Sequence, residues 1–191
     1  MRKILVMALA LSGAMLSGQE FKVGSQVADF QVRDLDGKAV SFSALKGPIT
    51  VVTFIATQCP VSNSYNQRMI DLYKDYTSKN VKFIFVNANR SEPASEVREH
   101  AKRVGFSFPV YKDPDNVVAD RFDAQVTPES YVIDSSGILR YHGSIDDDMN
   151  VARVRTQRLR MALDAMLMGK PVPAMETKAF GCTIKRIHRV S

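Results

Sequence analysis

The chain has 191 residues, a formal net charge of +6, 45% hydrophobic residues and 24% charged residues. This balance excludes a disordered chain, and the length is enough for one domain with a sizeable core. Basic residues gather near the C-terminus without interleaved aromatic residues. We interpret them as a solvated helix face and tail, and we expect no nucleic-acid partner.

Residues 1–18 have the pattern of an export signal. Arg2 and Lys3 precede an unbroken apolar run over residues 4–11, and several small residues follow. The run is shorter than the roughly 20 residues that span a bilayer, so we expect no stable membrane insertion. A buried first helix or strand is the alternative, which the basic start disfavours. We predict an exported protein, periplasmic where the host has an outer membrane.

The rest of the chain alternates between strand-like and helix-like patterns. Two extended pieces around a turn at residues 34–38 come first. The elements predicted after them are a strand at 49–56, helix at 62–78, strand at 81–86, helix at 97–104, strand at 108–111, helix at 117–122, hairpin at 130–142 and final helix at 151–167. This order predicts an α/β protein with one open sheet and helices on both faces.

Cys59 lies where a predicted buried strand gives way to a helix. Pro60 suits the first helical position, where its missing N–H costs nothing. A cysteine at that place faces the free N–H groups of the helix start, which favour the thiolate, and the thiolate is the nucleophile. The sequence therefore predicts thiol redox chemistry at Cys59. The alternative is an inert cysteine that closes a strand.

A set of motifs in order resembles a known superfamily. Residues 54–62 (FIATQCPVS) resemble the active-site motif of thioredoxin-fold thiol–disulfide oxidoreductases, and residues 24–30 (GSQVADF) resemble the opening of alkyl hydroperoxide reductase/thiol-specific antioxidant proteins. Further matching motifs carry the resemblance over residues 21–168, and the tail around AFGCTIK resembles a peroxiredoxin-like branch of exported redoxins. The resemblance implies a thioredoxin-like fold with a central mixed sheet, a redoxin domain at 19–169 and a tail at 170–191.

The chain also departs from both patterns. Ser62 replaces the second cysteine of a Cys-x-x-Cys motif, and Ala56 stands where peroxiredoxins carry Thr or Ser. The arginine that those peroxidases place near the nucleophile is not evident. Thr127 and Pro128 fit a thioredoxin-type loop instead, which implies a cis bond between them and a role in substrate positioning. We assign Ser62 to the same role through a hydroxyl bond to the thiolate, with an ordinary helix-start serine as the alternative.

Cys182 is the other cysteine of the chain. The 13 steps from Gly169 reach about 40 Å at roughly 3.3 Å each, so the tail can return to Cys59, with Phe180 and Ile184 as anchors. We expect Cys182 to be a resolving or structural disulfide partner, with a free thiol as the alternative. We expect Glu129 to be an exposed loop carboxylate, with a buried acid-base group as the alternative. We expect the aspartates at 146–148 to cap the final helix.

These observations predict a thiol-dependent oxidoreductase with Cys59 as nucleophile. The leading interpretation is peroxiredoxin-like peroxide reduction with Cys182 as resolving cysteine and an external thiol reductant. The alternatives are thiol–disulfide exchange on exported protein thiols, a copper(I)-binding module that uses both cysteines with a His or Met, and a disulfide that serves only stability. We expect no cofactor and no resident metal.

Overall fold

A computed structural model describes residues 20–187, so the predicted export signal at 1–18 lies outside the described residues. Its main sheet has seven strands in the order β2-β1-β5-β4-β3-β7-β8. They are β1 Gln31–Arg33, β2 Ala39–Ser41, β3 Ile49–Phe54, β4 Val81–Asn87, β5 Val110–Lys112, β7 Glu129–Asp134 and β8 Leu139–Gly143. β3 runs parallel to β4 and antiparallel to β7, so the sheet is mixed, as predicted.

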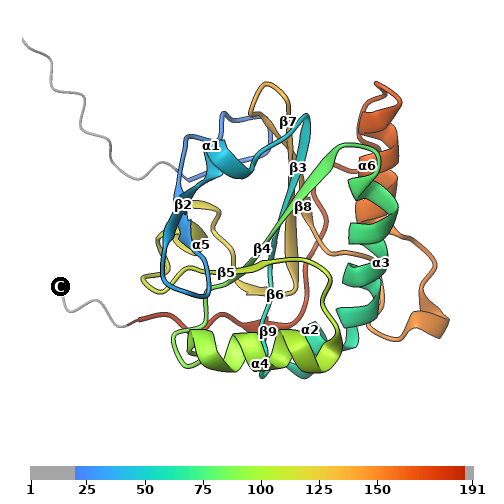
Figure 1. The fold of residues 1–191 in the computed structure, drawn as a ribbon. Helices are drawn as coiled ribbons and strands as arrows, with labels where there is room; N and C mark the ends of the chain where they lie inside the picture. The colour runs from blue at the N-terminus through green and yellow to red at the C-terminus, as the bar shows by residue number, and fades with distance from the viewer. Residues whose placement is uncertain (1–19, 188–191) are drawn as a thin grey trace, which may run out of the picture.

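Helices cover both faces of this sheet (Figure 1). The helices are α1 Phe42–Leu45, α2 Pro60–Ser64, α3 Asn66–Thr77, α4 Ala94–Val104, α5 Val117–Arg121 and α6 Arg158–Leu167, with a 3-10 turn at Val151–Arg153. One core cluster joins the sheet to α1 and α5, and a second joins its other face to α3, α4 and α6. The central strand β3 is buried along its whole length, as its β-branched sequence predicts.

Two predicted helices differ from the structure. The helix expected at 62–78 is divided at Tyr65 into α2 and α3, where the Tyr65 N–H donates to the Ser62 carbonyl at 3.1 Å, three residues back instead of four. The final helix begins at Arg158 instead of Val151. Asp147 accepts a hydrogen bond from the Arg155 backbone, which holds this segment outside the helix.

The C-terminal tail adds a small second sheet. Strand β9 (Cys182–Thr183) pairs antiparallel with β6 (Val126–Thr127), and the two form a sheet apart from the seven-stranded one. Figure 1 shows this pair at the same end of the molecule as α2 and α4. The tail therefore returns to the end of the sheet where Cys59 lies, as the chain-length argument predicted.

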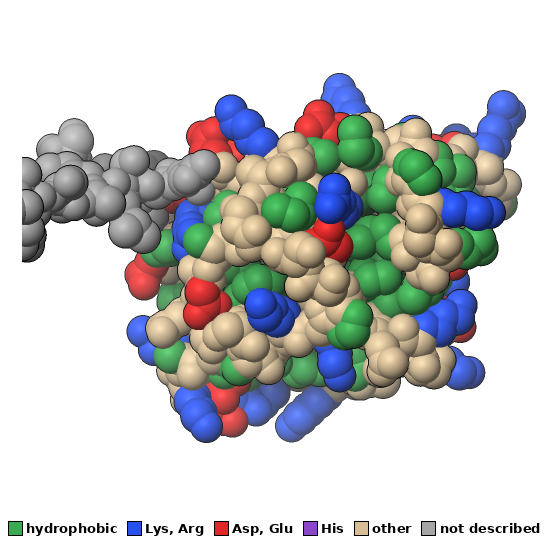
Figure 2. Space-filling model, turned by 90° about the horizontal axis from the view of Figure 1, so that it is seen from above, with side chains coloured by type: hydrophobic (Ala, Val, Ile, Leu, Met, Phe, Trp, Pro, Cys, Tyr) green, Lys and Arg blue, Asp and Glu red, His purple; other side chains and the backbone are tan. Residues whose placement is uncertain are grey.

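The opposite end of the molecule carries the turn between β7 and β8. Figure 2 views that end, and its Lys and Arg side chains stand mostly apart around the edge, with acidic side chains between some of them. Among residues 20–187, no helix is both long and apolar enough to cross a membrane.

Candidate active site

Cys59 is the N-cap residue of α2. Its Sγ accepts a hydrogen bond from the Ser62 backbone N–H at 3.2 Å, and Pro60 occupies the first turn. The cysteine is 3% exposed because the tail and the loop before Pro128 cover it. An N–H aimed at the sulfur favours a thiolate over a thiol, as the position of Cys59 at the start of a helix predicts.

Cys182 forms a disulfide with Cys59 in this structure. The two residues are 123 positions apart in sequence, and their Cα atoms lie 5.8 Å apart, within the range usual for disulfides. Cys182 is half-buried, so it is the more exposed residue of the pair. Cys182 is therefore a disulfide partner in this structure, and the alternative of a free thiol is not observed.

The loop before β7 completes the site. The Thr127-Pro128 peptide bond is cis, as expected, and the Thr127 carbonyl oxygen lies 3.4 Å from Cys59 Sγ. The Thr127 hydroxyl donates to the Cys182 carbonyl at 3.5 Å. Four of the predicted site residues therefore meet in one place, while their functional roles stay predictions.

Ser62 contributes differently from the expectation. Its hydroxyl oxygen accepts a hydrogen bond from the Ala56 backbone N–H at 3.1 Å, and its own backbone N–H is what contacts Cys59. The side chain is buried and ties the strand end to the start of α2. The role seen for the Ser62 hydroxyl is thus to hold the Cys59 loop.

Both predicted tail anchors are confirmed. The Phe180 ring meets the Tyr65 ring edge-on at a centroid distance of 6.3 Å, and Ile184 is 3% exposed within the core. Gly181 lies so close to the backbone of Thr127 that a Cβ at this position would overlap the Thr127 carbonyl group. Only glycine fits there without movement of the chain.

Glu92 is a site residue that the sequence interpretation missed. Its carboxylate accepts hydrogen bonds from the backbone N–H groups of Thr57 at 2.8 Å and Gln58 at 3.1 Å, directly before Cys59. Asn87 and Asn89 donate to it as well. Burial alone raises the pKa of Glu92, but these four donors outweigh it and hold the pKa below its usual value.

Lys112 lies beneath the same loop. Its ammonium donates to the backbone carbonyl of Glu92 at 2.6 Å and to that of Asn89 at 3.1 Å. Burial lowers the pKa of Lys112 to about 8, against the opposing attraction of Glu92 and Asp113. No local sequence signal marks Glu92 and Lys112 as partners, because the contact is made only when β4 and β5 pair.

Glu129 is buried, contrary to the expectation of an exposed loop carboxylate. It is 3% exposed, and it accepts hydrogen bonds from the backbone N–H groups of Gln125 at 2.7 Å and Val126 at 3.0 Å. His142 Nε2 lies 2.6 Å from its other oxygen. Burial raises the pKa of Glu129, and the hydrogen bonds from His142 and the two backbone groups bring it below its usual value. Glu129 thus fixes the backbone of β6.

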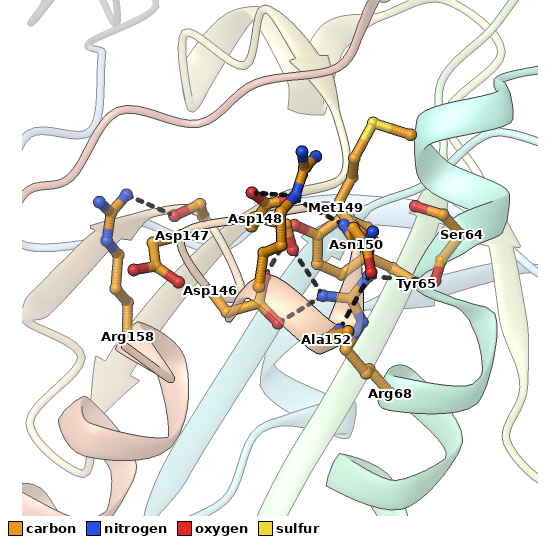
Figure 3. A network of polar contacts seen from close by, with 12 residues as sticks. Ser64, Tyr65, Arg68, Asp146, Asp147, Asp148, Met149, Asn150, Ala152 and Arg158 are labelled. Carbon is orange, nitrogen blue, oxygen red and sulfur yellow. Dashed lines mark hydrogen bonds and ion pairs between the residues drawn. The ribbon is translucent and has the colours of Figure 1, made fainter. Parts of the chain in front are cut away.

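Asp146 does not cap the final helix as expected. Figure 3 shows its carboxylate beside Arg68 and Tyr65, and Arg68 Nη1 lies 2.6 Å from Asp146 Oδ2. The Arg68 guanidinium also stacks over the Tyr65 ring, 3.6 Å from its centroid, and donates to the carbonyl groups of Asp148 and Met149. This cluster holds the Tyr65 ring in contact with Phe180 of the tail.

The described part of the chain contains no assembled site for the copper(I) alternative. Within residues 20–187, no group of three or more His, Cys, Asp or Glu side chains is placed to hold a metal ion. The sulfur ligands on which that alternative depends are joined to each other in this structure.

Comparison with known proteins identifies the family. Residues 23–142 match the AhpC/TSA family over more than half of the chain. The chain belongs to the AhpC/TSA family. A thiol-disulfide oxidoreductase ResA from Halalkalibacterium halodurans is 31% identical over 130 residues, which cover 67% of this chain and 73% of that protein.

Solved structures are similar as well. An uncharacterized conserved protein from Geobacillus kaustophilus has a TM-score of 0.82 and 30% identity, covering 89% of this chain and 95% of that one. A putative thioredoxin from Neisseria meningitidis has a TM-score of 0.54 and 30% identity, covering 63% of this chain and 79% of that one. The predictions of a redoxin domain, a thioredoxin-like fold and a thiol-dependent oxidoreductase are confirmed.

Proposed function

We propose that this AhpC/TSA protein is a thiol–disulfide exchange enzyme whose redox pair is Cys59 and Cys182. The observation that carries the proposal is the disulfide between the N-cap of α2 and a tail strand paired beside Pro128. The resemblance to a protein named thiol-disulfide oxidoreductase supports this activity over peroxide reduction. A protein thiol or disulfide is then the substrate, and an external thiol or disulfide partner resets the pair.

The exchange balances in either direction. In reduction, the Cys59 thiolate attacks a substrate disulfide, forms a mixed disulfide and releases one substrate thiolate. The Cys182 thiolate then attacks the Cys59 sulfur, the second substrate thiolate leaves, and the Cys59–Cys182 bond stores the oxidation. An external dithiol returns two electrons and two protons to the pair. Ser62, Thr127 and Pro128 keep the sulfur and the substrate backbone in place.

Peroxide reduction is the second candidate, favoured by the match to the AhpC/TSA family. Against it, Ala56 supplies no hydroxyl to a peroxide. Arg68 is engaged with Asp146, and Arg140 pairs with Asp134 at the end of β7 away from Cys59. The described hydrogen-bond groups beside Cys59 Sγ are the Ser62 N–H and the Thr127 carbonyl, and neither is a cation for a developing anion.

A trapping experiment tests the proposal. Reduced Cys182→Ser protein, mixed with a disulfide-bonded protein such as insulin, is expected to accumulate a mixed disulfide at Cys59, whereas Cys59→Ser forms none. Reduced wild-type protein is mixed in parallel with hydrogen peroxide, and both rates are followed by intact mass. Oxidation by peroxide without any trapped mixed disulfide would replace exchange by peroxidase activity.

We propose export as the setting for this chemistry. The pattern of residues 1–18 and a long-range disulfide both suit an oxidising compartment. Fractionation of the host cells with an antibody against the protein tests this, and recovery of the full-length chain from the cytoplasm alone would refute it.

A further inference from the structure

The C-terminal tail lies on the protein as an extended peptide would. The described partner of β6 is β9, with Thr127 opposite Cys182 and Val126 opposite Thr183. The Ile184 N–H donates to the Gln125 carbonyl at 2.9 Å and continues the pairing. An extended segment that adds a strand to a free backbone edge is a recurring mode of peptide recognition, with main-chain bonds for affinity and alternate side chains for specificity.

The side chains of the tail alternate in the way this mode requires. Phe180, Cys182 and Ile184 are buried or half-buried, while Thr183 and Lys185 are exposed. The inward residues meet three separate features, which are the Tyr65 ring, the Cys59 sulfur and the hydrophobic core. Between the first two, Gly181 passes the Thr127 carbonyl at a distance that leaves no room for a Cβ.

The tail is also held beyond its disulfide. The Lys185 N–H donates to Asn89 Oδ1 at 2.7 Å, and the Lys185 carbonyl accepts from the Arg90 N–H at 2.9 Å. Further along, the Ile187 N–H donates to Asn116 Oδ1 at 2.8 Å. These bonds do not involve the cysteines, so we expect the tail to remain in the groove beside Cys59 after the disulfide is reduced.

We propose that residues 178–187 are an internal substrate. They occupy, in register, a groove that takes an extended polypeptide with the pattern aromatic–Gly–Cys–x–aliphatic, and an outside substrate of that pattern binds by displacing them. The inference rests on the proposed exchange function and adds to it the class of substrate: a cysteine in an extended segment, preceded by glycine and flanked two residues away on each side by apolar side chains.

The strand exchange is coupled to the chemistry. While a substrate is bound through a Cys59–substrate disulfide, its backbone pairs with Val126 and Thr127 in place of the tail. When the tail pairs again, the Cys182 thiolate attacks the Cys59 sulfur, the Cys59–Cys182 bond forms, and the substrate leaves as a thiolate that takes a proton from solvent. Renewed pairing of the tail is therefore the step that expels the product.

The test uses full-length, reduced Cys182→Ser protein and a peptide that copies residues 178–187. The peptide cysteine is activated as a mixed disulfide with 5-thio-2-nitrobenzoate, so attack by Cys59 joins the peptide to the protein and releases a coloured thiolate. The control peptide carries the Gly181→Val change, and a cysteamine–thionitrobenzoate disulfide measures the reactivity of Cys59 towards a small molecule. The reported quantity is the ratio of the peptide rate to the small-molecule rate.

Two matched protein variants test the binding of the tail, and neither changes a residue in contact with Cys59. The first variant weakens the binding of the tail, and the second is its control. Lys185→Pro removes the N–H that donates to Asn89, whereas Lys185→Ala keeps it and changes only an exposed side chain. Because the peptide supplies its own N–H, the rate ratio for the copied peptide is expected to rise about fivefold in Lys185→Pro relative to Lys185→Ala. The rate ratio of the copied peptide is also expected to be about ten times that of the Gly181→Val peptide, since the added side chain would overlap the Thr127 carbonyl.

The outcomes separate the two proposals. If Cys59 reacts with neither the peptide nor the small disulfide, the exchange function itself fails. If both probes react, but the two peptides have equal ratios and Lys185→Pro behaves like Lys185→Ala, the exchange function stands and the internal-substrate inference is overturned. Selectivity for the copied peptide together with its rise in Lys185→Pro supports the inference.

Discussion

Reduction of the Cys59–Cys182 disulfide is expected to lower the free energy of unfolding by about 5 kcal/mol. The bond joins residues 123 positions apart. In the chain-entropy treatment, a closed loop of that length removes about 16 cal/mol/K from the unfolded chain, or about 5 kcal/mol at 25 °C. We expect the tail to stay docked in the reduced protein through Ile184 and the bonds at Lys185, so that the native state changes little and the effect acts on the unfolded chain.

Urea denaturation measures this difference. Oxidised wild-type protein is compared with wild-type protein kept reduced, and the urea midpoints are expected to differ by about 2.5 M for a slope of roughly 2 kcal/mol per M. Cys182→Ser is the control, since its midpoint should not respond to the reductant. A difference in the free energy of unfolding below about 1 kcal/mol would refute the reasoning. It would mean that the tail leaves the folded protein when the disulfide is reduced.

Three further changes test other parts of the site. The stability lost in Glu92→Gln should be greatest near neutral pH. The lowered pKa of Glu92 gives stability that is present above its unfolded value of 4.5 and is lost as the pH falls below 4.5, so the urea midpoints of variant and wild type should converge as the pH is lowered further. Arg68→Met leaves the Asp146 carboxylate, 4% exposed, without its cation and should cost about 3 kcal/mol in thermal unfolding, whereas Arg153→Met at an exposed pair should cost under about 1 kcal/mol. Gly181→Ala should lower the free energy of unfolding by about 2 kcal/mol in urea denaturation, because the added Cβ would overlap the Thr127 carbonyl group; an unchanged urea midpoint would contradict the close approach to Thr127.

The place of Cys59 followed from local sequence. A β-branched strand, a Cys-Pro step and a helical pattern each impose their own backbone, and their junction leaves the cysteine at an N-cap. The return of the tail followed from chain length and from two apolar residues around Cys182. These inferences succeeded because they depend on neighbours in sequence or on reach alone.

The buried carboxylates could not be inferred in the same way. Burial of a lone carboxylate is costly, so exposure is the reasonable expectation for Glu129 from sequence. The cost is offset by N–H donors from Gln125, Val126 and His142, and the last of these comes from the next strand. The break at Tyr65 could not be inferred either, because the helical periodicity of the apolar residues continues through it.

Glu92 and Glu129 together explain how a short tail strand finds a fixed partner. Glu92 holds the N–H groups of Thr57 and Gln58 directly before Cys59, and Glu129 holds those of Gln125 and Val126 directly before the Thr127-Pro128 bond. Each carboxylate thus fixes one of the two loops that meet at the disulfide, without touching either sulfur. Since two residues of β6 offer few main-chain bonds, the pairing with β9 depends on an edge that is already rigid. The two buried carboxylates therefore hold the backbone of both loops at the disulfide in place. We expect the position of this backbone to determine which extended segment can bring a cysteine to Cys59.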